Sequence, residues 1–409
     1  MTNILPFTHD FKNVRAHHAQ PQTQCVQDLL KEAQNLGVEF KTTQERANQW
    51  VDVLRKSAKN APFIEAFMQH YSLSTHEGLM LMSLAEALLR VPDTTTIDLL
   101  IQDKLDNHFA SFLKSSSTLV NLSTFALNVV AKTFQTHDGT LTSKLKRALS
   151  TPRDPLVRRG VFWAMKLLSN KFVMGHSIDV ALKRSKKDMD QGYTHSFDML
   201  GEAALTEEDA EHYFKTYLKA IHEIAKHNQG LRGPGISIKL SALHPRYTVL
   251  HLHDIKERLG QRLVHLAKEA AKANIALIID AEESEHLELS LELMGDLAKN
   301  PQLKTWQGLG LAVQAYQKRA TAVIDWLMNL AKENNRRIGV RLVKGAYWDT
   351  EIKLCQERGL DDYPVFTRKS FTDLSYVVCA SKLLKNIDLF YPAFATHNAM
   401  TVSMIMTMA

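Results

Sequence analysis

The feature that most constrains the fold is a repeat of short apolar segments in the second half of the chain. From Tyr193 onward, six segments of β-forming residues are each followed by a polar or glycine turn and, in most cases, by a stretch with helical apolar spacing. Strands and helices that alternate in this way are typical of a parallel sheet. The predicted strands are Phe197–Leu200, Ile236–Leu240, Ala276–Asp280, Leu309–Val313, Gly339–Val343 and Phe394–Thr396.

The residues at the ends of these strands favour a barrel with a functional mouth. No Gly-x-Gly-x-x-Gly motif follows the first strand, so a doubly wound dinucleotide-binding fold lacks its best signal. In a (β/α)8 barrel, the carboxyl ends of the strands converge on one mouth. A single polar residue at such a position usually forms its hydrogen bonds with a neighbour in the core. Polar residues at the ends of all six strands instead predict a functional site. The set is Gly201, Glu202, Lys239, Asp280, Gln314, Tyr316, Arg341, Lys344, Thr396, His397 and Asn398.

The fifth predicted strand carries the strongest of these signals. Arg341 interrupts an apolar run, where a long cation is costly unless an anionic or polar group meets it. Lys344 follows at the end of the strand, Gly345 leaves room for a ligand near the backbone, and Tyr347 and Trp348 offer two aromatic faces. This pattern indicates a site for a flat, negatively charged cofactor. The alternative is a buried strand whose arginine pairs with an acid on a neighbouring strand.

The first half of the chain shows helical periodicity and almost no strand pattern. Gln22–Leu36 and Ala47–Ala58 have apolar residues on one face, as expected for arm helices. Leu79–Leu89 is apolar nearly all round but too short to span a membrane, so it predicts a buried helix, capped by Ser74 with Glu77. The predicted organisation is a helical arm (1–60), an α domain (61–190) and a barrel (191–409).

Charge and cysteine content limit the partners that we expect. The chain carries 50 Lys and Arg against 44 Asp and Glu, a net charge of +6, but the two signs are interspersed, so we expect no nucleic-acid partner. Its 3 cysteines form no CxxC pair, and we expect neither a disulfide framework nor a metal site. The first residues resemble no signal peptide, so we expect a cytoplasmic protein that meets a membrane only peripherally, at the inner membrane.

Longer stretches around the strand ends carry a resemblance to a known family. They are Phe197-Asp-Met-Leu-Gly-Glu-Ala-Ala-Leu-Thr206, Gly233-Pro-Gly-Ile-Ser-Ile-Lys-Leu-Ser-Ala-Leu-His-Pro-Arg-Tyr247, Ile279-Asp-Ala-Glu-Glu283, Gln314-Ala-Tyr-Gln-Lys-Arg319, Tyr363-Pro-Val-Phe-Thr-Arg-Lys369 and Phe394-Ala-Thr-His-Asn398. In this order, they closely resemble the proline dehydrogenase region of the bacterial bifunctional proline-utilisation flavoenzymes. The resemblance covers nearly the whole chain.

The resemblance implies an all-α arm and α domain followed by an FAD-binding (β/α)8 barrel. The barrel would oxidise L-proline to 1-pyrroline-5-carboxylate, the first step of proline catabolism to glutamate, and pass electrons to a quinone at the membrane surface. Only six of the family's eight strands are expected in this chain, truncated at Ala409. An incomplete barrel exposes its sheet edges, so we expect a poorly stable chain that pairs with a second copy or with a complementing C-terminal fragment.

The resemblance also assigns roles to particular residues. Arg341 would lie beside the isoalloxazine ring, where a cation stabilises the reduced, anionic flavin. Lys239 would hold the proline carboxylate, Asp280 would order the pocket, and Glu202 resembles a gating acid that pairs with an arginine. The residues that would hold the cofactor are Gln314, Arg341, Lys344, Gly345, Tyr347, Trp348, Thr396 and His397.

Two other functions stay open at this point. The first is an inactive or split-gene fragment that at most binds FAD or a complementing partner. The second is a DNA-binding regulator, which only the basic charge suggests.

Overall fold

The computed structural model describes residues 7–18, 20–58, 96, 173–199, 203–227 and 229–409. The chain divides into two compact units: Val53–Arg184 forms one, and Met1–Asp52 together with Ser185–Ala409 forms the other. The predicted helix Leu79–Leu89 and its cap lie outside the described residues. The predicted domain boundaries stay a prediction. The second of these units carries all six strands described below.

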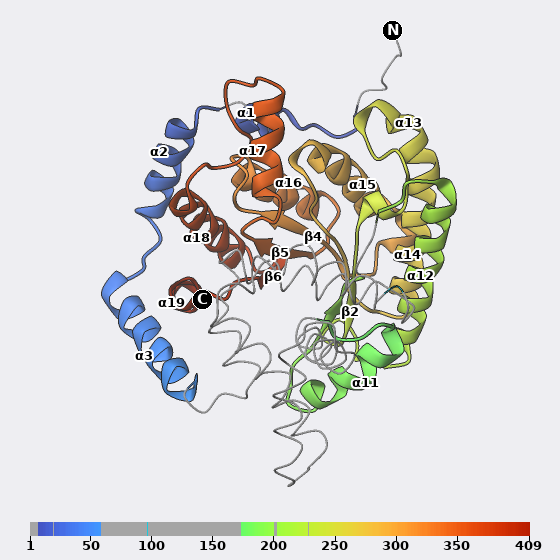
Figure 1. Cartoon of the computed structure of the whole chain (residues 1–409), viewed down its shortest axis with the longest axis horizontal. Coiled ribbons are helices and arrows are strands. Elements are labelled where there is room, and N and C mark those ends of the chain that lie inside the picture. The colour runs from blue at the N-terminus through green and yellow to red at the C-terminus, as the bar shows by residue number, and fades with distance from the viewer. Residues whose placement is uncertain (1–6, 19, 59–95, 97–172, 200–202, 228) are drawn as a thin grey trace, which may run out of the picture. The chain divides into compact units, whose positions relative to one another are not determined.

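One sheet of six parallel strands organises this unit. The strands follow one another in chain order from β1 to β6, and each pairs in parallel with the next. Their bounds are β1 Ser196–Phe197, β2 Gly235–Ile238, β3 Leu277–Ile279, β4 Leu309–Gln314, β5 Ile338–Val343 and β6 Phe390–Phe394. This order confirms the prediction of a six-stranded portion of a (β/α)8 barrel (Figure 1).

Helices follow the strands and cover the outer face of the sheet (Figure 1). Their bounds are α12 Glu207–Ala225, α13 Leu252–Asp254, α14 Gly260–Lys272, α15 Leu287–Lys299, α16 Ala320–Glu333, α17 Trp348–Glu357, α18 Lys369–Lys385 and α19 Ala399–Met408, whereas α11 Ile178–Met189 precedes β1. A capping box begins α12: Thr206 Oγ1 accepts a hydrogen bond from the Asp209 N–H at 3.1 Å, and the Asp209 carboxylate accepts one from the Thr206 N–H at 2.8 Å.

Alternation of burial along β5 separates the helix-facing side of the sheet from its inner side. On β5, Ile338, Val340 and Leu342 are buried, whereas Arg341 between them is partly exposed. Successive strand residues point to opposite faces, so Arg341 lies on the inner side. A Cβ at Gly310 of β4 would run into the Ile278 side chain and lie 2.7 Å from the Gly339 carbonyl oxygen, so only glycine fits there.

Strand β6 begins earlier than the sequence predicted. It starts at Phe390 instead of Phe394, which leaves Thr396 in the loop that follows. The reason is Pro392, which argues against a strand in a sequence pattern because it has no N–H to donate. Pro392 is tolerated here opposite Val340 because β6 is an edge strand of the sheet that the structure describes.

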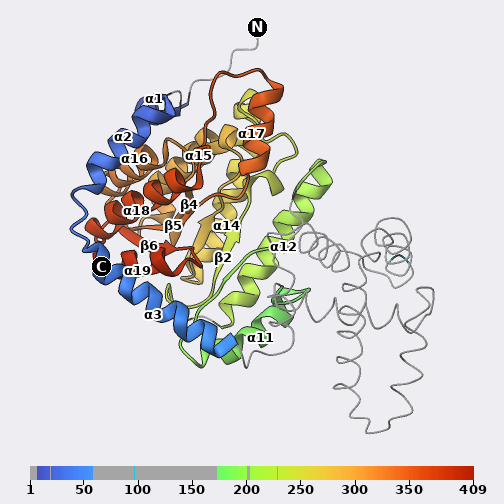
Figure 2. The ribbon, with the colours of Figure 1, turned by 60° about the vertical axis from the view of Figure 1, so that its left-hand side comes forward.

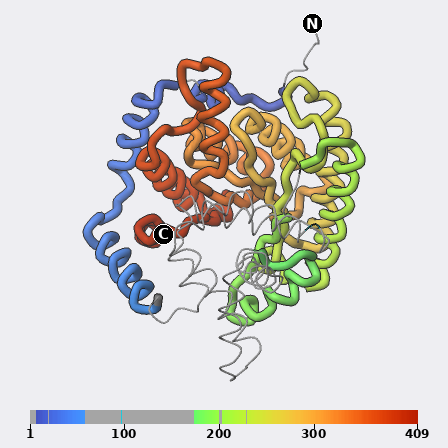
Figure 3. The backbone as a smooth tube through the Cα atoms, in the orientation of Figure 1, coloured from blue at the N-terminus to red at the C-terminus, as the bar shows by residue number. Residues whose placement is uncertain are grey.

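The arm belongs to this unit as far as Asp52, and its first helices pack against the outer helices. It consists of α1 Lys12–His18, α2 Gln22–Ala33 and α3 Phe40–Ala58. Figures 2 and 3 show the first two helices running past α16 and α18, and Cys25 and Leu29 of α2 share a buried cluster with Phe366 and Val378. Residues far apart in the sequence are therefore joined in one core. None of the described helices is both long and apolar enough to cross a membrane.

Candidate active site at the strand ends

Arg341 joins four strands on the inner side of the sheet. Its Nη1 donates to Asp280 Oδ1 at 2.6 Å, at the end of β3. Its Nη2 donates to Ser237 Oγ on β2 at 2.5 Å and to Ser196 Oγ on β1 at 3.2 Å. The arginine does have an acid partner, as the structural alternative predicted. This acid, Asp280, follows β3 and is therefore not on β4 or β6, the two strands that neighbour β5. The Arg341 guanidinium reaches it across the inner side of the sheet.

Lys239 and Asp198 extend this charged cluster. Lys239 Nζ lies 3.1 Å from Asp198 Oδ1 and 3.7 Å from Asp280 Oδ2. The side chains of Lys239 and Arg341 keep 22% and 24% of their area exposed, whereas Asp280 keeps 9%. The structure thus brings Lys239, Asp280 and Arg341 together. Two partly exposed cations lie beside one buried carboxylate.

Burial governs the titration of that carboxylate. Desolvation raises the pKa of Asp280 above its ordinary value; the charge of Arg341 opposes this rise, the charge of Asp198 adds to it, and the charge of Lys239 opposes it. The net direction is upward, so the desolvation of Asp280 outweighs the two cations.

Gln314 and Tyr316 fix the turn that follows β5. The buried Gln314 side chain donates from Nε2 to the Glu282 carbonyl at 2.9 Å, and its Oε1 accepts from the Ala346 N–H at 3.3 Å. Gly345 has a φ of +143°, and a Cβ there would run into the Tyr316 ring. This turn therefore needs glycine because of its backbone and its neighbour, a reason that the sequence did not reveal.

The two aromatic residues of this turn are held differently. Tyr347 is partly buried, and desolvation followed by the charges of Glu283 and Glu282 raises its pKa to about 12, so its hydroxyl stays protonated. Trp348 begins α17 and donates from Nε1 to the Phe366 carbonyl at 2.9 Å, while 41% of it remains exposed. The hydrogen bond thus holds the N–H edge of the indole, while part of the side chain remains exposed to solvent.

The remaining predicted residues lie toward α18 and α19. Lys344 Nζ donates to Asp373 on α18 at 2.5 Å, and the side chain is 25% exposed. Thr396 Oγ1 accepts from the Asn398 N–H at 3.2 Å, and His397 is exposed in the same loop. Glu202 lies outside the described residues, so its role as a gating acid stays a prediction.

Sequence reasoning missed several residues of the site: Ser196, Ser237, Asp198, Glu282 and Asp373. Ser237 and Lys239 are two residues apart and therefore on one face of the chain, which was the available signal. Asp373 lies within a helix and gave no signal. Among the described residues, no three His, Cys, Asp or Glu side chains are grouped to hold a metal ion.

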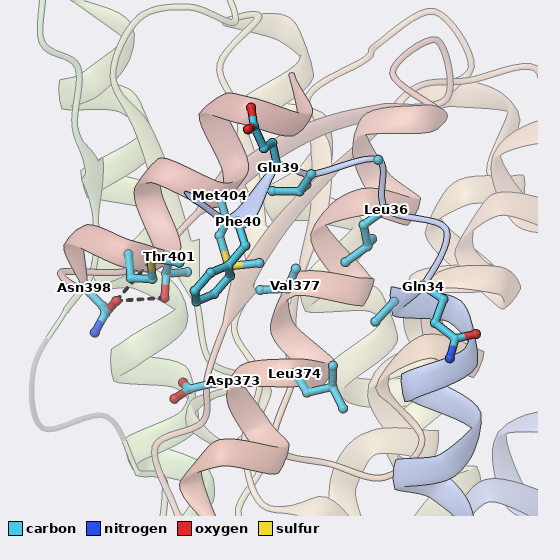
Figure 4. Close-up of a pocket in the computed structure, with 14 residues that line it drawn as sticks. Gln34, Leu36, Glu39, Phe40, Asp373, Leu374, Val377, Asn398, Thr401 and Met404 are labelled. Atoms are coloured by element: carbon cyan, nitrogen blue, oxygen red, sulfur yellow. Dashed lines mark hydrogen bonds between the residues drawn. The ribbon is translucent and has the colours of Figure 1, made fainter. Parts of the chain in front are cut away.

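A separate groove lies between the arm and the last two helices (Figure 4). Its lining is largely apolar, with Leu36, Phe40, Val377 and Met404 among the side chains that form it. Asn398 at its rim caps α19, since its Oδ1 accepts from the Thr401 N–H at 3.0 Å. Asp373 and Asn398 line this groove, but none of the described residues with a predicted catalytic or cofactor-binding role does, so we place the candidate site at the strand ends.

The raised pKa of Asp280 predicts a pH-dependent difference in stability between the wild type and Asp280→Asn. A carboxyl whose folded pKa exceeds its unfolded value of about 3.9 holds its proton more tightly when folded. The free energy of unfolding of the wild type, relative to the variant, should therefore fall as the pH rises above about 4 through the folded pKa, by about 1.4 kcal/mol per unit of pKa difference.

Urea unfolding of both proteins between pH 4 and 7 measures this difference, and Asp388→Asn, at an exposed carboxylate, is the matched control. A relative stability that rises with pH would mean that Arg341 and Lys239 dominate and lower the pKa of Asp280.

Comparison with known protein families identifies two segments of the chain. The proline dehydrogenase family matches residues 181–409, which include all six strands. A second family, described as the DNA-binding domain of proline dehydrogenase, matches residues 63–172. The expectation of no nucleic-acid partner therefore needs correction, because interspersed charges along predicted helices did not reveal a segment of this family. Apart from residue 96, that segment lies outside the described residues.

Individual relatives agree with the first of these matches. The bifunctional protein PutA of Escherichia coli K12 is 44% identical over 415 residues, and the match covers 99% of this chain but 31% of PutA. Proline dehydrogenase 1 of Bacillus subtilis is 28% identical over 203 residues, which cover 49% of this chain and 59% of that enzyme.

Solved structures show the same similarity. The crystal structure of a Bradyrhizobium japonicum PutA mutant, D779Y, superposes with a TM-score of 0.65 and 41% identity, over 99% of this chain and 40% of that one. The chain thus spans about a third of the length of the curated PutA relatives that it matches (31%). With the family match over more than half of its residues and the parallel strands that carry the charged cluster, this chain belongs to the proline dehydrogenase family.

Proposed function

We propose that this chain provides the FAD and L-proline sites of a proline dehydrogenase, which oxidises L-proline to 1-pyrroline-5-carboxylate. The observation that carries the proposal is the cluster of Lys239, Asp280 and Arg341 on the inner side of a sheet from this family. Oxidation of the ring C–N bond to C=N removes two electrons and two protons from proline. FAD, when bound, would supply the two-electron acceptor, and a membrane quinone would be the next acceptor.

Lys239 is the proposed partner of the proline carboxylate. Its side chain is 22% exposed, and its ammonium group already lies between two carboxylates, so its position is defined before any substrate arrives. A substrate carboxylate would replace part of the charge that Asp198 and Asp280 now supply. Asp280 would keep Lys239 and Arg341 at a fixed separation through its contacts to both, which preorganises the pocket.

The residues around β5 fit an anionic, planar cofactor. Arg341 and Lys344 are cations that remain about a quarter exposed, and the Gln314 amide holds the backbone of the turn beside them. Trp348 presents an open indole surface against which a ring system can pack, and Tyr347 is a protonated hydroxyl donor. The chemistry of this donor set supports FAD. Thr396 and His397 extend it beyond β6, and Glu202 is the proposed gate.

An absorption spectrum of the purified chain with added FAD, before and after excess L-proline without oxygen, tests this function. We expect the flavin band to appear in the protein fraction and to bleach with L-proline, because the cations and the carboxylate cluster supply both subsites. Asp388→Asn should behave like the wild type, since Asp388 is exposed and follows α18.

Two other outcomes would contradict the proposal in different ways. Bound FAD that does not bleach would place the cofactor site in this chain and leave proline oxidation unsupported. A folded chain that takes up no FAD would favour the alternative of an inactive fragment. A dimer and peripheral attachment to a membrane are further parts of the proposal.

A second candidate function is DNA binding, which the family match at residues 63–172 favours. Binding through phosphate contacts should weaken steeply with salt. Fluorescence anisotropy of a labelled duplex at about 50 and 200 mM salt measures this, and we expect binding at the lower concentration that is largely lost at the higher one. No binding at low salt would exclude this function for the chain.

A further inference from the structure

The arm is tied directly to a loop of the barrel portion. Gln22, the first residue of α2, accepts a hydrogen bond at its Oε1 from the Thr367 N–H at 2.7 Å and donates from its Nε2 to Thr367 Oγ1 at 3.0 Å. These two residues are 345 positions apart in the sequence. One amide side chain of the arm thus satisfies both a backbone and a side-chain group of the loop.

The same loop holds the indole of Trp348. The carbonyl of Phe366, the residue before Thr367, accepts from Trp348 Nε1 at 2.9 Å. The Phe366 N–H donates to the Tyr316 carbonyl at 2.8 Å, beside the isolated antiparallel bridge between Gln317 and Val365. The position of the indole edge therefore depends on where this loop holds one carbonyl group.

A buried lysine ties the arm and the loop together a second time. Lys318 Nζ donates to the Gln20 carbonyl of the arm and to Asp362 Oδ2 of the loop, both at 2.8 Å, and its side chain is 1% exposed. Burial acts to raise the pKa of Asp362, but its hydrogen bonds with Lys318 and the Tyr363 N–H lower it overall. Lys318 anchors the beginning of the loop, whereas Gln22 anchors the end that carries the indole partner.

We propose that Gln22 is a positioning residue of the flavin site, which acts through Thr367 and the Phe366 carbonyl on Trp348. The inference rests on the proposed function, since it assigns the arm a role in cofactor binding. The route is short: Gln22 fixes the Thr367 N–H, the peptide group between Phe366 and Thr367 is rigid, and its carbonyl oxygen orients the indole. Loss of the Gln22 contact would let this peptide rotate and tilt the indole surface.

Gln22→Ala, Trp348→Phe and the double variant test the route. We expect Gln22→Ala, which removes both contacts to Thr367, to raise the dissociation constant for FAD by about fivefold, because part of the energy of these contacts is lost from the indole's position. In the Trp348→Phe background the same substitution should have little further effect, because the group through which Gln22 acts is gone. Gln22→Glu, which keeps the acceptor for the Thr367 N–H, should restore most of the affinity.

The control is Gln24→Ala, at an exposed position on the same helix. Hydrogen exchange of the Thr367 amide and the thermal midpoint supply readouts that need no flavin. The inference predicts faster exchange at Thr367 in Gln22→Ala but not in Gln24→Ala, with a similar thermal midpoint in both.

Three results would overturn the inference. The first is an FAD affinity of Gln22→Ala equal to that of the wild type, and the second is a loss of affinity that persists undiminished in the Trp348→Phe background. The third is a wild type that takes up no FAD, which removes the proposed function as well. The first two leave the proposed function intact, so the two failures are distinguishable.

Discussion

The contact between Arg341 and Asp280 is the constraint on which the rest of the site depends. A guanidinium on the inner side of a parallel sheet must be compensated, because a cation removed from water without a partner is strongly unfavourable. The Asp280 carboxylate accepts a hydrogen bond from Nη1 of Arg341 at 2.6 Å, and the hydroxyls of Ser237 and Ser196 accept from its Nη2. Strands β1, β2, β3 and β5 are therefore fixed relative to one another by a single side chain, and Lys239 is placed beside the same carboxylate.

The turn after β5 extends this arrangement toward the arm. Gln314 links it to the loop after β3, and the Tyr316 ring packs where any side chain at position 345 would lie. Trp348 then donates a hydrogen bond to the Phe366 carbonyl, and the Thr367 N–H donates one to the Gln22 side chain. The arm is thus more than an outer layer, because its polar contacts reach the loop that orients an aromatic residue of the proposed cofactor site.

Much of the fold was predictable from the sequence because short apolar strands, turns and amphipathic helices repeat in chain order. The displaced β6 shows the limit of this pattern: Pro392 counts against a strand locally, but the edge position that tolerates it is a tertiary property. The candidate site could be proposed from the sequence as a set of strand-end residues. Its pairings could not, since the contacts of Arg341 with Asp280 and of Gln22 with Thr367 join residues 61 and 345 positions apart.

The reduction potential of FAD bound to the wild type and to Arg341→Ala tests the central claim most directly. If Arg341 lies beside the cofactor, its charge favours the additional negative charge of reduction, so the variant should bind flavin with a lower potential. A thermal melt confirms that the variant is folded. Equal potentials, together with equal flavin retention, would contradict the account and leave Arg341 as a structural partner of Asp280 alone.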